Sequence, residues 1–306
     1  MNWSGVMPAM TTVFHPDFSV DHEAIARRSR WLIENGCSGI IALGSLGEAS
    51  TLRFDEKIAI YTTVVKALEG KAPVVAAISD LSTADAVALA QAAEAAGCSG
   101  LMVLPAYVYK GDWRENKAHV KAVIEATQLP CLLYNNPVAY GVDFLPEQIA
   151  ELAAELPNLV AVKESSTDVR RVTAIRALLG NRLSIFVGVD DAIVEGIAAG
   201  AVGWVAGLVN ALPRESVDLF ELAKKGTSPE CTELYNWFLP LLRMDTLPKF
   251  IQLIKQVEQE AGVGLARVRA PRLELEGAEL EATKKAYAYA QGHRPASAHS
   301  STPFAL

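Results

Sequence analysis

The sequence of 306 residues has few of the features that mark metal, redox and disulfide-rich proteins. Its four cysteines are widely spaced without a CxxC pair, and its five histidines form neither an HExxH motif nor a cluster. These absences argue against a zinc site and against a disulfide framework. They favour reduced core cysteines in a cytosolic protein, and we predict no metal and no cofactor.

Charge and hydropathy exclude two further classes of partner. The net charge of −7 is spread without acidic or basic blocks, so we expect no contact with nucleic acid or an anionic membrane. The most hydrophobic window, residues 192–213, is interrupted by Glu195 and four glycines, which argues against a membrane span. The first ten residues do not have the pattern of a secretory signal. We therefore predict a cytoplasmic protein whose partners are small organic molecules.

What the chain does contain is a regular alternation of apolar, β-rich runs with segments of helical spacing. The eight runs are 5–13, 38–44, 73–79, 100–105, 129–135, 159–163, 183–188 and 201–207. A weak repeat supports the alternation, because Gly36, Gly97 and Gly200 each follow a helical segment and precede a run, as helix C-caps do. Eight consecutive βα units without a GxGxxG turn predict an α/β fold, a TIM (β/α)8 barrel.

The barrel is predicted to occupy residues 1–225. Segments 228–262 and 278–290 have helical spacing, so residues 226–291 are expected to form an appended C-terminal helical region. Residues 292–306, GHRPASAHSSTPFAL after Gln291, are small, polar and unpatterned, and they predict a mobile tail.

The stretch NLVAVKESS, residues 158–166, places a lysine where a buried strand ends. Such a lysine either extends its ammonium to water or becomes a neutral nucleophile. The two interpretations of Lys163 are a surface ion pair with Glu164 or another acid, and a catalytic amine.

Because the active sites of TIM barrels lie at the carboxyl ends of the strands, other strand ends indicate the partners of Lys163. The loop GSLGE, residues 44–48, either makes a tight βα turn or offers backbone N–H groups to a carboxylate, and its Ser45 supplies a hydroxyl. Glu48 is interpreted as structural. Gly188 and Gly207 follow strands seven and eight without a clear basic residue, so they are candidates for substrate contact and not for phosphate binding.

Two tyrosines also stand at strand ends. Tyr134 ends the strand before that of Lys163, and Tyr107 follows the fourth strand. Each is typical of an aromatic packed at the base of a loop. Together with Lys163 and Ser45, however, phenols are suited to pass protons to and from an imine.

These motifs resemble those of the dihydrodipicolinate synthase and N-acetylneuraminate lyase family of class I aldolases, over roughly residues 5–290. The resemblance lies in GSLGE, in the Tyr-Asn-Asn-Pro segment at 134–137 and in Lys-Glu-Ser at 163–165. It implies a Schiff base between Lys163 and a 2-oxo acid, with Tyr134, Ser45 and Tyr107 as the proton relay. It also implies that the backbone around Ser45 and Leu46 binds the carboxylate of the substrate. In the family Tyr107 often comes from a neighbouring subunit, and homotetramers built as dimers of dimers are usual.

Two departures narrow the implied function. Leu46 replaces a second threonine of the synthase loop, and Ala139 replaces an arginine that contacts the aldehyde substrate's carboxylate. The synthase reaction is therefore disfavoured, because a methyl group cannot replace a bidentate clamp. The loop and Tyr-Asn-Asn-Pro are most similar to deaminases of 4-hydroxy-1-pyrroline-2-carboxylate, which yield 2-oxoglutarate semialdehyde. The alternatives are a pyruvate-dependent aldolase, a 2-keto-3-deoxy acid aldolase or dehydratase, and a non-catalytic ligand-binding barrel.

Overall fold

Eight parallel strands form a closed barrel in which neighbours in sequence are neighbours in space. The computed structural model describes residues 2–304. The last strand pairs with the first through Gly203 and Gly5, which closes the barrel. The strands are β1 Gly5–Met10, β2 Ile40–Ala42, β3 Val74–Ile78, β4 Gly100–Val103, β5 Cys131–Asn135, β6 Leu159–Glu164, β7 Ser184–Val187 and β8 Gly203–Ala206. The predicted fold class is confirmed.

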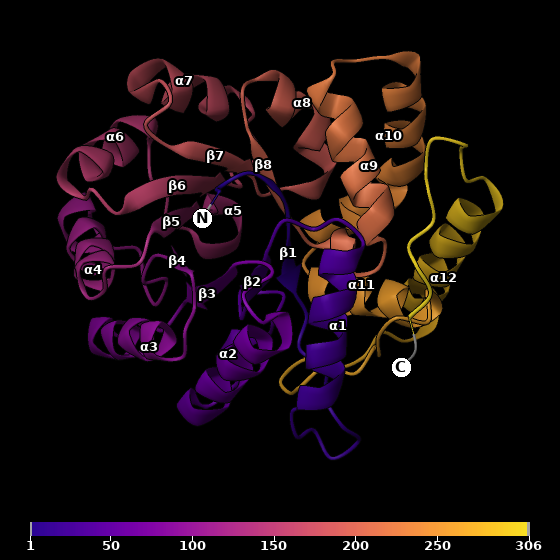
Figure 1. Cartoon of the computed structure of the whole chain (residues 1–306), viewed down its shortest axis with the longest axis horizontal. Helices are drawn as coiled ribbons and strands as arrows, with labels where there is room; N and C mark the ends of the chain where they lie inside the picture. The colour runs from indigo at the N-terminus through magenta and orange to yellow at the C-terminus, as the bar shows by residue number, and fades with distance from the viewer. Residues whose placement is uncertain (1, 305–306) are drawn as a thin grey trace.

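The helices surround this barrel, and the last three gather on one side of it (Figure 1). The α-helices are α1 His22–Glu34, α2 Phe54–Leu68, α3 Thr83–Ala95, α4 Trp113–Glu125, α5 Pro137–Tyr140, α6 Pro146–Glu155, α7 Arg170–Leu179, α8 Ile193–Ala198, α9 Pro213–Lys224, α10 Pro229–Leu242, α11 Phe250–Glu260 and α12 Gly277–Gly292. The 3-10 turns are η1 Ala49–Thr51, η2 Asp190–Ala192, η3 Leu208–Asn210 and η4 Arg243–Thr246. Across residues 2–304, the structure contains no helix that is both long enough and apolar enough to span a membrane.

The repeated glycines end their helices as the sequence predicts. Gly36, Gly97 and Gly200 have φ angles of 97°, 89° and 107°, one residue beyond the caps of α1, α3 and α8. This left-handed conformation suits glycine because it has no Cβ. It turns the chain from the end of a helix toward the next strand of the barrel.

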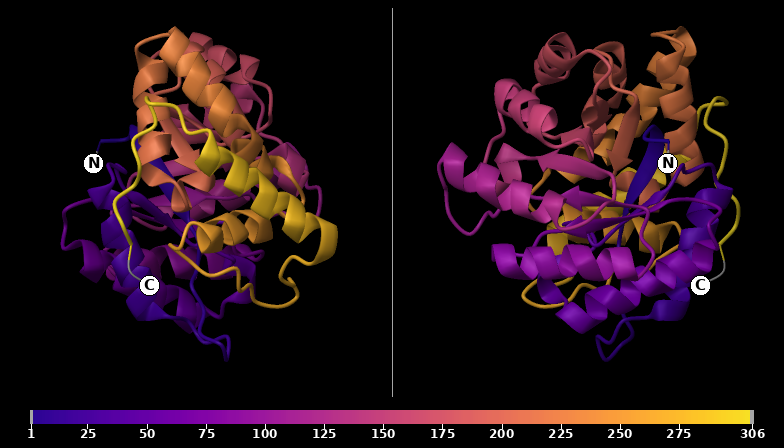
Figure 2. Two further views of the ribbon diagram at one scale, coloured as in Figure 1. Left: turned by 90° about the vertical axis from the view of Figure 1, so that its right-hand side faces the viewer. Right: turned by 60° about the vertical axis from the view of Figure 1, so that its left-hand side comes forward.

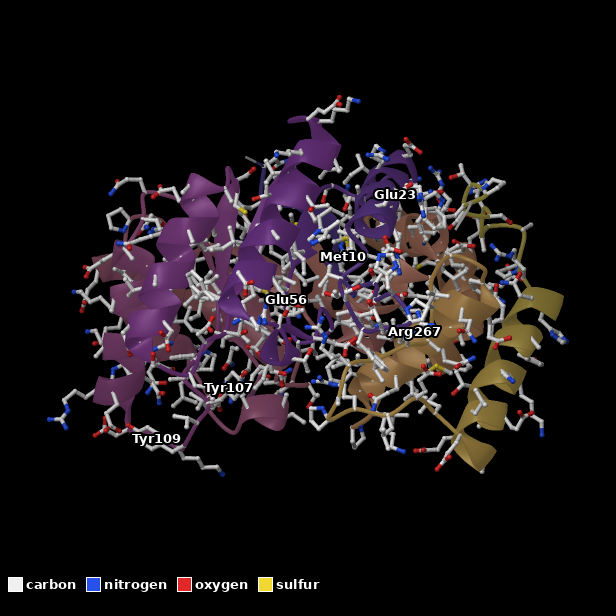
Figure 3. All side chains as sticks on the ribbon, turned by 90° about the horizontal axis from the view of Figure 1, so that it is seen from below. Met10, Glu23, Glu56, Tyr107, Tyr109 and Arg267 are labelled. Atoms are coloured by element: carbon white, nitrogen blue, oxygen red, sulfur yellow. The ribbon has the colours of Figure 1, made fainter. Side chains whose placement is uncertain are left out.

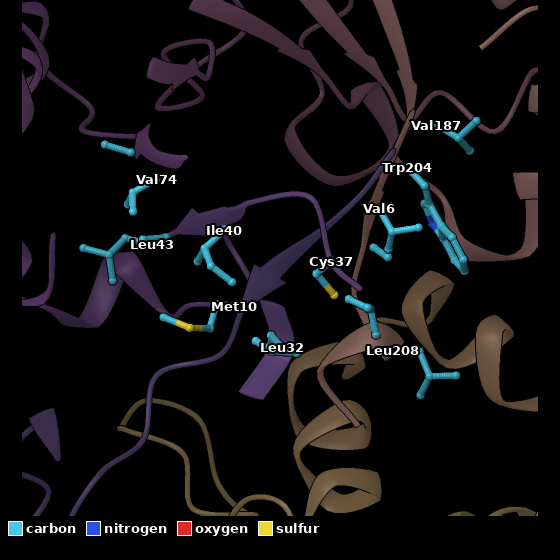
Figure 4. Close-up of a cluster of buried hydrophobic side chains, with 14 of the residues drawn as sticks. Val6, Met10, Leu32, Cys37, Ile40, Leu43, Val74, Val187, Trp204 and Leu208 are labelled. Atoms are coloured by element: carbon cyan, nitrogen blue, oxygen red, sulfur yellow. The ribbon is translucent and has the colours of Figure 1, made fainter. Parts of the chain in front are cut away.

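Each strand is buried on both faces, which explains why the strands read as continuous apolar runs. Val6, Ile40 and Val74 face the surrounding helices, in the cluster drawn in Figure 4. Their neighbours Met7, Ile41 and Val75 face the barrel interior. The four cysteines are buried and free. The period of two therefore decides which side chains reach the interior, and it directs Ala161 and then Lys163 inward along β6.

Buried ion pairs join the appended helices to the loops at the barrel mouth. Lys255 of α11 donates to a carboxylate oxygen of Glu48 (2.8 Å) and to the backbone oxygen of Thr12 (2.9 Å). Glu258, one turn later, pairs with Arg28 (2.5 Å) and accepts from the Thr11 hydroxyl (2.8 Å). Helix α11 therefore holds both the loop after β2 and the segment that directly follows β1.

The chain end differs from the predicted mobile tail. The backbone N–H of His299 donates to Asp218 (3.0 Å), and the Ser301 hydroxyl donates to Glu215 (2.7 Å), both on α9. The indole of Trp31 on α1 donates to the backbone oxygen of Thr302 (2.8 Å). Figure 2 shows this segment returning along the molecule from α12. Residues 292–304 are thus packed through polar partners that hydrophobic patterning cannot reveal, while residues 305 and 306 lie outside the described part.

Candidate active site

A cavity of about 530 Å³ lies at the carboxyl ends of the strands. Every residue predicted from the sequence as part of the site lines it. These residues are Ser45, Leu46, Tyr107, Tyr134, Lys163, Gly188 and Gly207. Their common location follows from the barrel, because parallel strands present all their carboxyl ends at one mouth. The cavity is large enough for a small organic acid.

Lys163 lies at the base of this cavity beside Tyr134. The two residues are register partners on β6 and β5. The Nζ atom of Lys163 lies 4.0 Å from the centroid of the Tyr134 ring, and 6% of the lysine is exposed. The amine also interacts electrostatically with Asp190 and Asp245, but among residues 2–304 it forms no direct ion pair. The amine therefore reaches the cavity without a saturating acid partner.

Glu164 faces away from the lysine, which argues against the alternative interpretation of a surface pair between Lys163 and Glu164. Its carboxylate accepts from the backbone N–H of Ser166 (2.7 Å) and from the side chain of Asn135 (3.1 Å). Burial raises the pKa of Glu164, and these hydrogen bonds oppose the rise. Because successive residues of a strand point to opposite faces, Glu164 supports the end of β6 while Lys163 serves the cavity.

Close packing explains why glycine occupies position 188. A Cβ added to Gly188 would lie 2.0 Å from the Ser165 hydroxyl oxygen and 2.5 Å from Cε of Lys163. The Ser165 hydroxyl is buried and forms no hydrogen bond to a described residue. The backbone after β7 is thus pressed against the stem of the lysine, which limits the positions that Nζ can take.

The loop after β2 is held in an uncommon conformation. Leu43 and Glu48, which flank Gly44–Gly47, both have positive φ angles (63° and 57°), although neither is glycine. Glu48 is completely buried and accepts from Lys255 (2.8 Å) and from the backbone N–H of Arg269 (2.9 Å). These contacts agree with the structural role predicted for Glu48. Backbone strain of this kind is typical of functional loops, where surrounding contacts stabilise it.

Tyr140 is a site residue that the sequence did not indicate. Its hydroxyl is hydrogen-bonded to the Ser45 hydroxyl, and its ring contacts Tyr134 edge-on, with ring centroids 5.8 Å apart. Tyr107 packs against the other side, with a centroid distance of 4.8 Å. Figure 3 shows Tyr107 near the short helix that carries Tyr140, and Tyr109 further out. Burial raises the pKa of both Tyr107 and Tyr140, so the phenols stay protonated at neutral pH.

The short helix α5 places Tyr140. The side chain of Asn136 accepts from the backbone N–H of Ala139 (3.0 Å), and Pro137 takes the first helical position. These are ordinary signals for a helix start. The amide of Asn136 also donates to the Tyr134 hydroxyl (3.0 Å), so one residue fixes both the helix and the phenol.

Two carboxyl groups lie on the β7–β8 side of Lys163. Asp190 is fully buried and accepts from the Trp204 indole (3.0 Å) and from the backbone N–H groups of Gly207 (3.0 Å) and Leu208 (2.7 Å). Burial raises its pKa to about 6 against these hydrogen bonds. Asp245 of η4 lines the cavity, and burial, followed by the charge of Asp190, raises its pKa well above the ordinary value.

Known proteins resemble this chain in both sequence and structure. A model of the Dihydrodipicolinate synthetase family matches residues 2–289. The chain belongs to this family. Members of the Dihydrodipicolinate synthetase family are lyases of the class I aldolase type that act on small molecules, so the predicted family, enzyme class and class of partner are confirmed.

Individual relatives cover nearly the whole chain. The 4-hydroxy-tetrahydrodipicolinate synthase of Desulforamulus reducens is 30% identical over 284 residues, which are 93% of this chain and 96% of that protein. The structure of the same enzyme from Methylacidiphilum fumariolicum SolV has a TM-score of 0.91 at 28% identity and covers 95% of this chain and 97% of its own. A monomeric dihydrodipicolinate synthase variant has a TM-score of 0.88 at 26% identity, with coverage of 95% and 97%.

Proposed function

We propose that the protein deaminates 4-hydroxy-1-pyrroline-2-carboxylate to 2-oxoglutarate semialdehyde through a Schiff base on Lys163. The observation that carries the proposal is the unpaired amine of Lys163 in a cavity beside Tyr134 and the hydrogen-bonded pair of Ser45 and Tyr140. Only a neutral amine attacks a carbon–nitrogen double bond, and the absence of a saturating carboxylate favours attack.

The reaction has six steps in this proposal. Lys163 adds to C2 and the ring opens, which leaves an imine at C2 and a free amine at C5. A proton leaves C3, and the hydroxyl at C4 departs as water. Rearrangement of the remaining double bonds gives an imine at C5, whose hydrolysis releases ammonia. Hydrolysis of the lysine imine frees the product, so that substrate and one water give the semialdehyde and ammonia.

The phenols and the Ser45 hydroxyl move the protons at C2 and C3. Tyr134 lies against the amine of Lys163, and Tyr140 joins Tyr134 to Ser45. The backbone N–H groups of Ser45 and Leu46 bind the single carboxylate. General acid–base catalysis of this kind contributes roughly 10²- to 10⁴-fold, so Tyr140→Phe should lower kcat by about that factor without preventing imine formation.

The wall of the cavity supports this substrate over that of the synthases. Leu46 and Ala139 both line it. The family resemblance implies that the synthases carry an arginine in place of Ala139. A small cyclic acid with one carboxylate leaves no second anion to be bound there. We therefore propose the deaminase reaction and not the synthase reaction.

A second candidate is a 2-keto-3-deoxy acid aldolase or dehydratase, and Arg272 favours it. This arginine lines the cavity, and its nearest carboxylate oxygen, on Glu48, lies 4.0 Å away. Glu48 is already bonded to Lys255 and to Arg269. The guanidinium is thus available to the distal hydroxyl or anionic group of a longer 2-oxo acid.

The deciding experiment combines imine trapping with a substrate panel. The enzyme is incubated with pyruvate and then borohydride, and its peptides are mapped by mass. An adduct on Lys163 with ammonia release from the hydroxypyrroline acid supports the deaminase. An adduct without ammonia, but with turnover of a 2-keto-3-deoxy acid, supports the second candidate. No adduct with any 2-oxo acid contradicts both and favours a non-catalytic barrel.

We also propose the homotetramer that the family resemblance implies. Within one chain Tyr140 already contacts Ser45, Tyr134 and Tyr107, and one relative is a monomeric variant. Light scattering on the purified protein tests the homotetramer. A monomeric mass would contradict it.

A further inference from the structure

Asp245 reaches the cavity from outside the barrel strands. It belongs to η4, between α10 and α11, and it lines the cavity together with Lys163 and Gly207. A Cβ added to Gly207 would lie 2.5 Å from a carboxylate oxygen of Asp245. The glycine thus lets the carboxyl group lie against the end of β8, on the cavity floor.

The two neighbouring acids differ in their hydrogen bonds. Asp190 is occupied by three N–H donors, from Trp204, Gly207 and Leu208. It also has no exposed surface. Asp245 is bonded more sparsely: the backbone N–H of Asp190 is the donor that lowers its pKa, and its side chain lines the cavity. Asp190 therefore supports the turn after β8, whereas the carboxyl group of Asp245 is available to a bound molecule.

The position of Asp245 complements the phenols. In strand order Lys163 on β6 has Tyr134 on one side, on β5, and the ends of β7 and β8 on the other. The phenols and Ser45 therefore reach a bound acid from the β2 and β5 side, and Asp245 reaches it from the β8 side. Beyond the proton transfers at C2 and C3, the proposed reaction needs a proton at the C4 hydroxyl, which does not leave as hydroxide.

We propose that Asp245 is the catalytic acid that protonates the departing C4 hydroxyl, an inference that rests on the proposed deamination. The electron pair of the C2–C3 enamine forms the C3–C4 double bond, and the C4–O bond breaks. Its electron pair stays on oxygen, which takes the Asp245 proton and leaves as water. The resulting carboxylate then takes a proton from C5, which restores the acid and leaves an enamine at C4 and C5. Addition of a proton at C4 and loss of one from the C5 nitrogen give the C5 imine.

The neighbouring charges agree with an acid that holds its proton. Burial and the charge of Asp190 raise the pKa of Asp245, while Lys163 opposes the rise. Once the proton is transferred, the carboxylate lies near the imine nitrogen of Lys163, which is positive in the conjugated intermediate. The attraction between this nitrogen and the carboxylate stabilises the charged form of Asp245 after it has given up its proton.

The test uses Asp245→Asn in the full-length protein with two substrates that differ only at C4. Ammonia release from the 4-hydroxy acid should fall by roughly 10²-fold or more, the usual contribution of a general acid. The 4-chloro analogue needs no proton for departure of chloride, so its turnover should stay within about threefold of the wild type. Pyruvate should still be trapped on Lys163 by borohydride. Asp245→Ser replaces the asparagine variant if that variant does not fold.

Asp191→Asn is the matched control, because Asp191 directly follows Asp190 but does not line the cavity and lies near Arg243 (3.7 Å). Its ammonia release should equal that of the wild type. An Asp245→Asn variant that deaminates the hydroxy acid normally, that loses both substrates equally, or that no longer traps pyruvate would overturn the role of Asp245. Absence of ammonia release by the wild type would instead overturn the proposed deamination.

Discussion

Lys163 and Lys255 are both buried lysines, yet they lie in two regions with different chemistry. Lys255 is 1% exposed and pairs with Glu48 at 2.8 Å, while its Nζ also donates to the backbone of Thr12. Lys163 is 6% exposed, contacts the face of Tyr134 and opens to the cavity. Burial alone therefore does not mark a reactive amine. A reactive lysine also lacks a paired acid and has space for a second molecule.

The two lysines also differ in the groups that surround them. Around Lys255 the charges compensate one another, since Glu48, Glu258 and Arg28 form short contacts with named partners. Around Lys163 the groups are phenols, a serine and carboxyls with raised pKa, to which we assign the proton transfers of the proposed reaction. One region holds the fold together, and the other is left incompletely satisfied for chemistry.

The strongest test of this contrast replaces the reactive amine. Lys163→Arg keeps the positive charge, but a guanidinium is never neutral in the usual pH range and cannot form the imine. We expect turnover to fall by about 10⁴-fold or more, as when a catalytic nucleophile is removed. Steady-state ammonia release and borohydride trapping measure it, with circular dichroism as the check of folding. Substantial turnover in this variant would show that the imine forms elsewhere.

The complementary test breaks the paired lysine. Lys255→Met leaves the carboxylate of Glu48 buried without its cation, which should lower the free energy of unfolding by about 3–5 kcal/mol. Denaturant unfolding measures the change. Adding Glu48→Gln should recover part of the loss, because the unpaired charge is then removed. Lys284→Met is the control, since Lys284 is exposed and lies 3.8 Å from Glu281, and it should cost less than about 1 kcal/mol. Equal losses in the two single variants would contradict the contrast.

A smaller effect is the change in the free energy of unfolding with pH that Asp190 causes beside the cavity. The pKa of Asp190 is about 6 in the folded protein and 3.8 at its ordinary value, so the folded state holds an extra proton between these pH values. Its contribution to stability is fully present below pH 4 and is lost as the pH rises through 6. The free energy of unfolding of the wild type, relative to Asp190→Asn, should therefore fall by up to about 3 kcal/mol from pH 4 to pH 7. A difference that rises over this range would refute the assignment.

The site residues that could be predicted from the sequence are those at the carboxyl ends of strands. Lys163, Tyr134 and Ser45 could be found because buried runs are visible in the sequence and a closed barrel brings their ends together. Even the inward direction of Lys163 follows from the period of two. Gly188 and Gly207 were found for the same reason, although only the structure shows the side chains that lie against them.

The site residues that the sequence did not indicate lie outside the strands, where side chains do not alternate with a regular period. Tyr140 enters the cavity because the four-residue helix α5 turns it back, and its place depends on the cap made by Asn136. Asp245 and Arg272 come from the segments beside α11 and α12, whose position against the barrel depends on long-range ion pairs. The packed chain end was missed because its contacts are polar and distant in sequence. Spacing along the chain does not encode such contacts.

The link between Lys255 and the loop after β2 also bears on the order in which the enzyme acquires its site. Lys255 and Glu48 are 207 residues apart, and Thr11 and Glu258 are 247 residues apart. During synthesis the loop that carries Ser45 leaves the ribosome early, but its bracing residues leave it near the end. A nascent chain that has completed all eight strands still lacks these ion pairs. The strained loop therefore reaches its final geometry only when α11 docks, which makes assembly of the site one of the last events of folding.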